Sequence, residues 1–183
     1  MPFTVGGGVS TLAQIKDLIQ AGAEKVSINA AAVQRPGFIH EASEEFGSST
    51  IVVSMDVKKK RFAGERVFVK NGSSASNFKP VEFAQLMQEK GAGELLVNSI
   101  ENDGMMDGYD QALIAAVADS VDIPVIACGG AGCVQDLSKV VTEGKASAAA
   151  AGSLFVYHGP RRAVLINLPE KEAMRASFKS IGL

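Results

Sequence analysis

Two stretches of the chain decide the fold: Pro2-Phe3-Thr4-Val5-Gly6-Gly7-Gly8 and Pro124-Val125-Ile126-Ala127-Cys128-Gly129-Gly130. Each is a short apolar run that ends in glycines and is followed by a segment of helical period. The correspondence continues downstream, where Asn29-Ala30-Ala31 falls on Ala151-Gly152-Ser153. It indicates one strand–glycine–helix–strand unit that occurs twice. The alternative is a chance similarity between α/β sequences.

The rest of the chain alternates in the same way between β-branched apolar runs and amphipathic stretches, as parallel β/α units do. We expect strands at residues 3–5, 25–29, 51–56, 94–98, 124–128 and 147–150. Helices are expected to begin near Thr11, Pro36, Pro80, Gln111 and Val134. Residues 61–78, rich in Gly, Ser and Asn, are expected to form a long loop with a small hairpin. The predicted fold class is α/β, in a single domain of residues 1–183.

The composition excludes several classes of function. Of the 183 residues, 46% are hydrophobic and 21% are charged, and the formal net charge is −2, which is typical of one globular domain without a nucleic-acid surface. The cysteines and histidines stand at no metal-ligand spacing, so we expect no metal and no cofactor. Neither a charged leader nor a long apolar run is present, so we expect no membrane insertion and a location in the cytoplasm.

The glycines that end the repeated strands suit phosphate binding. Glycine lets the backbone turn sharply and approach a ligand, and N–H groups at the start of the following helix attract anions. The next strand brings a cluster of small residues to each glycine pair, Asn29-Ala30-Ala31 in one unit and Ala151-Gly152-Ser153 in the other. Two such sites would suit a substrate with a phosphate at each end. The alternative is that the glycines serve only tight turns.

Two acidic residues stand where a predicted strand gives way to its loop, on the rim that carries catalytic groups in parallel barrels. Asp56 ends an otherwise apolar strand, and Asp103 precedes Gly104 after a later strand. A carboxylate at such a rim can act as a general acid or base. Two alternatives stay open: Asp56 caps a loop or pairs with Lys58, and Asp103-Gly104 is an ordinary turn.

Several segments together resemble the cyclase subunit of imidazole glycerol phosphate synthase, a (β/α)8 barrel of histidine biosynthesis. They read PFTVGGGV (2–9), AEKVSIN (23–29), SMDVK (54–58), DG (103–104) with GYD (108–110), and IPVIACGGAG (123–132). The resemblance implies a barrel that takes ammonia from a glutaminase partner. With it the barrel cleaves and cyclises a bis-phosphorylated ribulosyl-formimino carboxamide ribonucleotide, giving imidazole glycerol phosphate and aminoimidazole carboxamide ribonucleotide.

The same resemblance implies roles for individual residues. Asp56 matches the catalytic general acid/base. Asn98, Asp103 and Gly104 match residues that contact the substrate. Gly7, Gly8 and Asn29 match one phosphate site. The other phosphate site is matched by Gly129, Gly130, Gly152 and Ser153. Lys25 and Glu94 match the charged gate through which ammonia enters from the opposite end of the barrel. A surface ion pair is the alternative for these two residues.

The chain also departs from the family pattern. It begins at what resembles the third barrel strand, so we expect a (β/α)8 TIM-barrel type lacking its first two β/α units, with about six remaining. A second catalytic Asp and another gate residue would be absent with them, which leaves enzymatic activity open. Ala30 replaces a usual Thr, Cys128 a usual Ser, and Glu101-Asn102 a usual Asp-Arg. We expect weaker phosphate binding, and a homodimer formed through the open sheet edges.

The end of the chain introduces a second branch. Residues 151–160 and 162–167 resemble cyclase-related proteins of surface-polysaccharide gene clusters, which are thought to work with a glutaminase and a sugar amidotransferase on acetamidino sugars. Three kinds of function therefore stay open: an enzyme of the cyclase type in either pathway, a phosphate-ligand binding module without catalysis, and an assembly subunit that channels ammonia to a partner.

Overall fold

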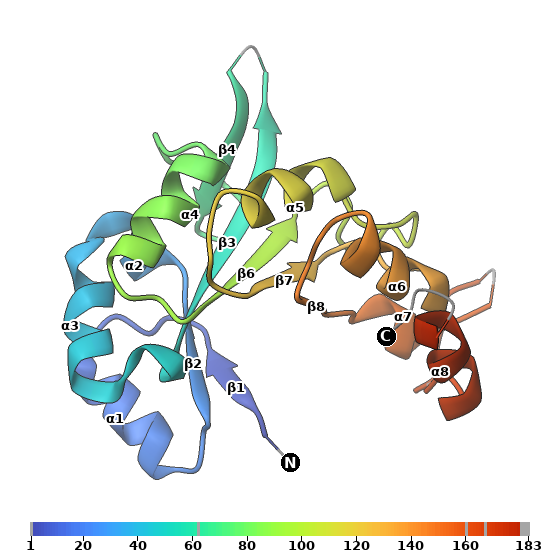
Figure 1. The fold of residues 1–183 in the computed structure, drawn as a ribbon, viewed down its shortest axis with the longest axis horizontal. Helices are drawn as coiled ribbons and strands as arrows, with labels where there is room; N and C mark the ends of the chain where they lie inside the picture. Colours follow the sequence, from blue (N-terminus) through green and yellow to red (C-terminus); the bar gives the residue numbers. More distant parts are fainter. Residues whose placement is uncertain (1, 62, 160, 167, 180–183) are drawn as a thin grey trace.

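The computed structural model describes residues 2–61, 63–159, 161–166 and 168–179, and its centre is a curled sheet (Figure 1). The main strands lie in the order β1-β2-β3-β6-β7-β8, and each neighbouring pair is parallel. They span Thr4–Gly6 (β1), Lys25–Ile28 (β2), Ile51–Lys60 (β3), Glu94–Ser99 (β6), Val125–Cys128 (β7) and Ala148–Ala149 (β8). The expected partial (β/α)8 barrel is confirmed.

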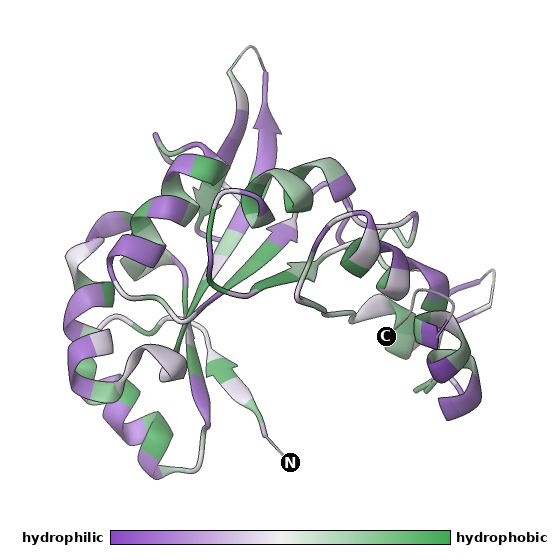
Figure 2. Cartoon of the chain, viewed as in Figure 1, coloured by the Kyte–Doolittle hydropathy of each residue, from purple (hydrophilic) through white to green (hydrophobic). Residues whose placement is uncertain are grey.

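Helices connect the successive strands and follow one another around the outside of the curled sheet (Figure 1). They are α1 (Leu12–Gln20), α2 (Ala30–Gln34), α3 (Gly37–Phe46), α4 (Pro80–Glu89), α5 (Gln111–Ala118) and α6 (Val134–Thr142), with a 3-10 turn at Ser48–Thr50. Hydrophilic and hydrophobic residues alternate around α1, α3 and α4 (Figure 2). Each helix can therefore bury one side against the sheet and present the other to solvent.

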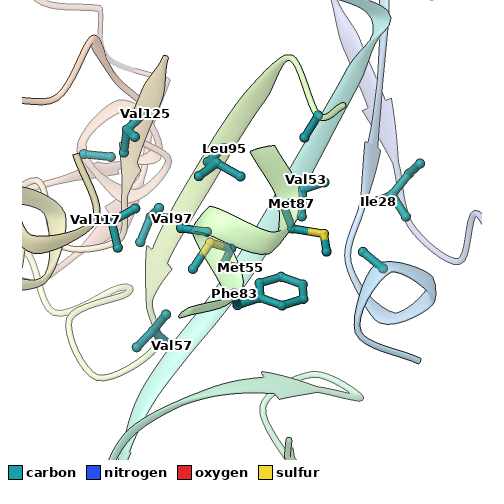
Figure 3. Close-up of a cluster of buried hydrophobic side chains, with 14 of the residues drawn as sticks. Ile28, Val53, Met55, Val57, Phe83, Met87, Leu95, Val97, Val117 and Val125 are labelled. Atoms are coloured by element: carbon teal, nitrogen blue, oxygen red, sulfur yellow. The ribbon is translucent and has the colours of Figure 1, made fainter. Parts of the chain in front are cut away.

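Alternate strand residues build the hydrophobic core beneath these helices (Figure 3). Val53 and Met55 of β3, and Leu95 and Val97 of β6, are fully buried there together with Phe83 of α4. Full burial of a side chain of this size contributes about 1.5–3 kcal/mol. The residues between them point to the opposite, inner face of the sheet, because side chains alternate along a strand. The inner face is thus free to carry polar groups.

Local signals start several helices where the sequence predicts them. Thr11 caps α1 and accepts a hydrogen bond from the backbone N–H of Gln14 at 3.3 Å. Asp110 does the same for α5, with the N–H of Leu113 at 3.1 Å. Pro80 occupies the first position of α4, where its missing N–H costs nothing. These starts are confirmed, and so is the start of α6.

The segment after β3 differs from the expectation. The strand was expected to end at Asp56, but it continues to Lys60 and pairs in antiparallel fashion with β4 (Gly64–Val69), which in turn pairs with β5 (Ser74–Ala75). The hairpin projects beyond the sheet (Figure 1). Residues 61–78 are thus more regular than a loop with a small hairpin. The reason is burial: Val57 and residues 67–69 lie in the interior, so apolar packing extends the ladder.

Strand β2 also ends earlier than expected. Asn29, predicted as its last residue, is the N-cap of the short helix α2. Pro36, predicted within the first turn of a helix, stands at the N-cap of α3 with helical angles of φ −52° and ψ −33°. The small-residue cluster Asn29-Ala30-Ala31 therefore turns directly from a strand into a helix.

The end of the chain adds elements that the sequence did not predict individually. They are α7 (Ser153–Val156), the antiparallel pair β9 (Tyr157–His158) and β10 (Ala163–Val164), and α8 (Lys171–Lys179). Helix α8 packs on α6, where the hydroxyl oxygens of Ser138 and Ser177 lie 2.6 Å apart. Among the described helices, none combines the length and the apolar character that a membrane crossing requires.

Candidate functional site

The carboxyl ends of three neighbouring strands converge on Asp56. Its Oδ2 accepts a hydrogen bond from Nδ2 of Asn29, and its Oδ1 accepts one from Nδ2 of Asn98, each at 3.0 Å. Asn29 follows β2 and Asn98 lies in β6, on either side of β3. The expected alternative, an ion pair between Asp56 and Lys58, is not among the ion pairs of the described residues.

The two amides that hold Asp56 leave their own oxygens without a partner. Oδ1 of Asn29 and Oδ1 of Asn98 are buried and have no hydrogen-bond donor within the described part of the chain. An ionised carboxylate is an acceptor only, so each amide must turn its NH2 group toward Asp56 and its oxygen away. Buried polar atoms normally have partners, so these two oxygens are exceptions directly beside Asp56.

A cavity of about 530 Å³ opens beside this carboxylate. Gly7 and Gly8 line it with φ angles of +110° and +73°, and nothing lies within 4 Å of where a side chain would begin on either residue. The remaining lining residues are Gly6, Val9, Ser10, Ser27, Asn29, Ala30, Ala31, Gln34, Ser54, Asp56, Lys70 and Asn71. The structure thus brings together Gly7, Gly8, Asn29 and Asp56, which the sequence predicts as site residues.

Several lining residues were missed by the sequence reasoning, and two of them come from outside the parallel β/α units. Lys70 and Asn71 belong to the turn between β4 and β5, which the longer hairpin carries over to the cavity. A usable signal was present, because Lys70-Asn71-Gly72 is a turn sequence directly after an apolar strand. It gave no indication of which strand end the turn would face.

The second predicted phosphate site has a different geometry. Gly129 and Gly130 also have positive φ angles, of +83° and +117°, but neighbouring atoms crowd them. A Cβ on Gly129 would lie 2.6 Å from Oδ1 of Asn98, and one on Gly130 would lie 2.1 Å from the carbonyl oxygen of Gly108. Close packing against β6 and the loop after it therefore accounts for these glycines, and phosphate binding there stays a prediction.

The other half of the second site is more open. Gly152 is the N-cap of the four-residue helix α7, and Ser153 is its first residue. Nothing lies within 4 Å of a Cβ placed on Gly152. Strand β8 pairs with β7, and the N–H of Ala150 donates to the carbonyl of Ala127 at 2.8 Å. The strand ends that lead to Gly130 and Gly152 are therefore adjacent, as the sequence repeat predicts.

Asp103 and Gly104 lie in the loop between β6 and α5, where Asp103 is exposed. Burial raises the pKa of the Cys128 thiol, and the carboxylates of Asp103 and Asp56 raise it further. A hydrogen bond from the backbone N–H of Gly129 lowers it, but by less than these effects together. Both predicted acidic residues therefore act electrostatically on one thiol at the end of β7. Cys128 is half-buried at the end of β7, where a thiolate is disfavoured.

Several contacts fix the loop that carries Asp103. The Asn102 side chain donates to the carbonyl of Gly108 at 2.9 Å, and the Tyr109 hydroxyl donates to the carbonyl of Ala150 at 2.9 Å. From the end of the chain, Arg162 donates to the carbonyl oxygens of Gly104 at 3.0 Å and Met105 at 2.9 Å. Arg162, which the sequence did not single out, thus joins the β9–β10 hairpin to the Asp103 loop.

The two predicted gate residues meet at the other end of the strands. Lys25, the first residue of β2, forms an ion pair with Glu94, the first residue of β6. Their side chains are only 28% and 19% exposed, so the pair is more shielded than an ordinary surface ion pair. A cavity of about 400 Å³ adjoins it, lined by Pro2, Phe3, Thr4, Glu24, Lys25, Glu94 and Ile126.

Within the described residues, no group of three His, Cys, Asp or Glu side chains could hold a metal ion.

Fold and site together define a class of protein: a partial parallel β/α barrel with a carboxylate and a glycine-lined cavity at the carboxyl ends of its strands. A family model described as "Histidine biosynthesis protein" matches residues 1–160. The chain belongs to this family.

Three relatives narrow the resemblance to the HisF type. A hisF2 protein of Pseudomonas aeruginosa, provisionally named as an imidazole glycerol phosphate synthase subunit, is 45% identical over 170 residues, covering 93% of this chain and 68% of that protein. The HisF subunit of imidazole glycerol phosphate synthase of Symbiobacterium thermophilum is 47% identical over 164 residues (90% and 64%). That of a Synechocystis species is 48% identical over 160 residues (86% and 61%). The chain thus spans between 61% and 68% of the length of these relatives.

Proposed function

We propose that this chain is the cyclase-type barrel of an imidazole glycerol phosphate synthase in histidine biosynthesis. It would bind a bis-phosphorylated substrate at the carboxyl ends of its strands and react it with ammonia from a glutaminase partner. The names of the HisF relatives support this assignment. We place the activity in the cytoplasm and treat residues 1–183 as one partial-barrel domain.

The observation that carries the proposal is the position of Asp56. Its carboxylate is held by two amide N–H groups and lines the same cavity as Gly7 and Gly8. A carboxylate fixed in this way can take or give a proton at a substrate atom, while the open glycine backbone binds a phosphate nearby. General acid/base catalysis of this kind contributes a factor of about 10²–10⁴.

The Lys25–Glu94 ion pair fits the entry of ammonia from the opposite end. The pair and its cavity lie at the amino ends of the strands, and the Asp56 cavity lies at their carboxyl ends. Between them the inner face of the sheet carries small side chains such as Ser27 and Ser54. A glutaminase docked on the amino ends would release ammonia toward Asp56 along this face.

Turnover with free ammonia tests the proposal without the partner. The purified chain is incubated with the bis-phosphorylated ribulosyl-formimino carboxamide ribonucleotide, and imidazole glycerol phosphate is measured alongside substrate binding by calorimetry. Asp56→Asn should bind substrate but lose turnover by roughly 10²-fold or more. Gly7→Asp places a carboxylate in open space beside the phosphate and should lose binding. Asp122→Asn, at an exposed Asp before β7 that lines neither cavity, is the matched control. Equal turnover by Asp56→Asn and the parent chain would reject the assignment.

A second candidate rests on the end of the chain. Residues 151–160 and 162–167 resemble the acetamidino-sugar proteins, which favours that related branch, with the same barrel chemistry on another substrate. Ammonia-dependent turnover of the sugar precursor but not of the ribonucleotide would select this branch. Binding without any turnover would indicate a phosphate-ligand module instead.

A further inference from the structure

The turn between β4 and β5 has a special backbone conformation at the edge of the first cavity. Lys70 and Asn71 have φ angles of +53° and +54°, and Gly72 follows at +75°. Side chains rarely adopt this left-handed region, and such residues persist only where the surroundings determine them. Here the N–H and the hydroxyl of Ser73 both donate to the carbonyl of Lys70, at 3.2 Å and 2.7 Å. The turn is therefore fixed in a conformation that places Lys70 and Asn71 at the cavity.

The turn between β4 and β5 also contacts the end of β6, the strand that pairs with β3 beside Asp56. A Cβ on Gly72 would lie 3.0 Å from Cδ1 of Ile100, which follows β6 directly. The hairpin stem carries the turn, since Asp56 pairs across the ladder with Phe68, two residues before Lys70. The turn is thus tied to both of the strands that supply Asp56 and Asn98.

The first cavity contains one lysine that forms no ion pair within the described residues. Among the lining residues that the structure describes, only Asp56 and Lys70 are ionisable. Both Asp56 oxygens already accept hydrogen bonds from Asn29 and Asn98. Lys70 forms no ion pair with any residue that the structure describes. One cation is therefore available beside a glycine backbone whose N–H groups are themselves anion-binding.

We infer that Lys70, assisted by Asn71, is the cationic component of the first phosphate site and closes it from the β4–β5 turn. The ligand is a phosphate monoester, held by the backbone at Gly7 and Gly8 on one side and by the Lys70 ammonium on the other. The inference rests on the proposed function, because it assumes that this cavity receives a substrate phosphate. It adds a binding residue on the hairpin, an element separate from the two parallel strands that carry Gly7, Gly8 and Asn29.

Calorimetric titration of the full chain with ribose 5-phosphate, at low and at physiological salt, tests the inference. Lys70→Met should weaken binding roughly ten- to hundredfold, the size expected for one hydrogen bond to a charged group, and should reduce the dependence on salt. Lys70→Arg should bind nearly as well as the parent. Lys59→Met, an exposed lysine on the hairpin stem outside the cavity, should behave as the parent. Urea unfolding verifies that each variant is folded.

The outcomes separate the inference from the proposal beneath it. If the parent binds ribose 5-phosphate and Lys70→Met binds it equally well with the same salt dependence, the role of Lys70 is rejected and the phosphate site stands. If the parent binds free ribose as tightly as ribose 5-phosphate, or binds neither, the cavity is no phosphate site. The role of Lys70 and the phosphate site of the proposed function are then both rejected.

Discussion

Gly7 and Gly129 stand at equivalent positions of the repeat but are glycines for different reasons. Both have positive φ angles, +110° and +83°. Gly7 faces open space, whereas a Cβ on Gly129 would lie 2.6 Å from Oδ1 of Asn98 and 2.7 Å from the carbonyl oxygen of Ser99. The first glycine leaves space beside the backbone, and the second lets the chain after β7 approach the end of β6. The same residue type thus faces open space in one unit and allows close packing in the other.

Alanine substitutions should separate these two reasons. Gly7→Ala adds only the strain of a side chain at positive φ and should cost about 1 kcal/mol of unfolding free energy. Gly129→Ala adds a steric clash with a buried amide and a backbone carbonyl and should cost about 2–5 kcal/mol. Gly152→Ala, at an ordinary φ of −111° in open space, is the control. Urea unfolding measures all three, and equal losses for Gly7→Ala and Gly129→Ala would contradict the account.

Cys128 should make the protein sensitive to alkaline pH. Burial, then Asp103 and Asp56, raises the pKa of its thiol in the folded state. The unfolded chain releases this proton above about pH 8.5, while the folded protein keeps it. Stability is therefore constant at lower pH and falls as the pH rises through this window, by at most about 1.4 kcal/mol per pH unit for one proton.

Urea unfolding of the parent and of Cys128→Ser from neutral to about pH 10 checks this expectation. Serine keeps a small polar side chain but does not titrate in this range, so the early part of the decline should disappear. Tyr109, whose pKa is also raised by burial and then by Cys128 and Asp136, adds a decline at higher pH in both proteins. Identical curves for parent and variant from the onset would show that Cys128 does not control the effect.

At the scale of elements, the β9–β10 hairpin is connected to the Asp103 loop by one side chain. The guanidinium of Arg162 donates to two carbonyls of the loop, at Gly104 and Met105. Because Arg162 is exposed, we expect Arg162→Ala to cost only about 1 kcal/mol, concentrated in the loop. Hydrogen exchange of the amides of residues 102–108 should accelerate. Arg161→Ala, next along the chain and also exposed, should leave them unchanged. Equal acceleration of exchange in both variants would show that the hydrogen bonds of Arg162 do not specifically stabilise the loop.

Most elements of the barrel could be predicted from the sequence, because their signals are local. The apolar runs identified β2, β3, β6 and β7, and cap residues such as Thr11 and Asp110 identified helix starts. The full hairpin β3–β4 could not be predicted, since its length depends on burial of Val67 and Phe68 against the rest of the molecule. Helix α2 and strands β9 and β10 are very short and carry too little periodicity to be recognised.

The candidate site divides in the same way. Gly7 and Asn29 directly follow their strands, and Asp56 lies near the end of the parallel pairing of β3 with β6, so the parallel topology brings them together. The resemblance singled out Lys25 and Glu94 as gate residues, and their ion pair was given only as the alternative, because the two residues are far apart in sequence. Lys70 and Arg162 reach their places from outside the β/α repeat, by a hairpin and by the end of the chain. Such contacts depend on tertiary structure that no local pattern encodes.

At the scale of the whole molecule, the sheet is curled but open. Its outer face is covered by helices and its inner face carries Asp56, Asn98 and the Lys25–Glu94 pair. Strand β1 has only β2 as a neighbour among the described strands, and β8 has only β7. Unpaired parallel edges expose backbone donors and acceptors that favour association with another chain. We therefore expect the 183-residue chain to form a homodimer in which each copy covers an open edge of the other.

The edge of β1 offers a specific test of that dimer. The carbonyl of Phe3 accepts a hydrogen bond from the N–H of Glu24, on the side of β2. Backbone groups alternate along a strand, so the N–H of Thr4 points to the free side. Thr4 is also the first residue of β1, a position that tolerates proline. Thr4→Pro should thus remove an edge donor without breaking the β1–β2 ladder, and should shift a dimer toward monomer in sedimentation at micromolar concentration. Thr4→Val, which keeps the N–H, should remain dimeric, and a parent chain that sediments as a monomer would refute association through this edge.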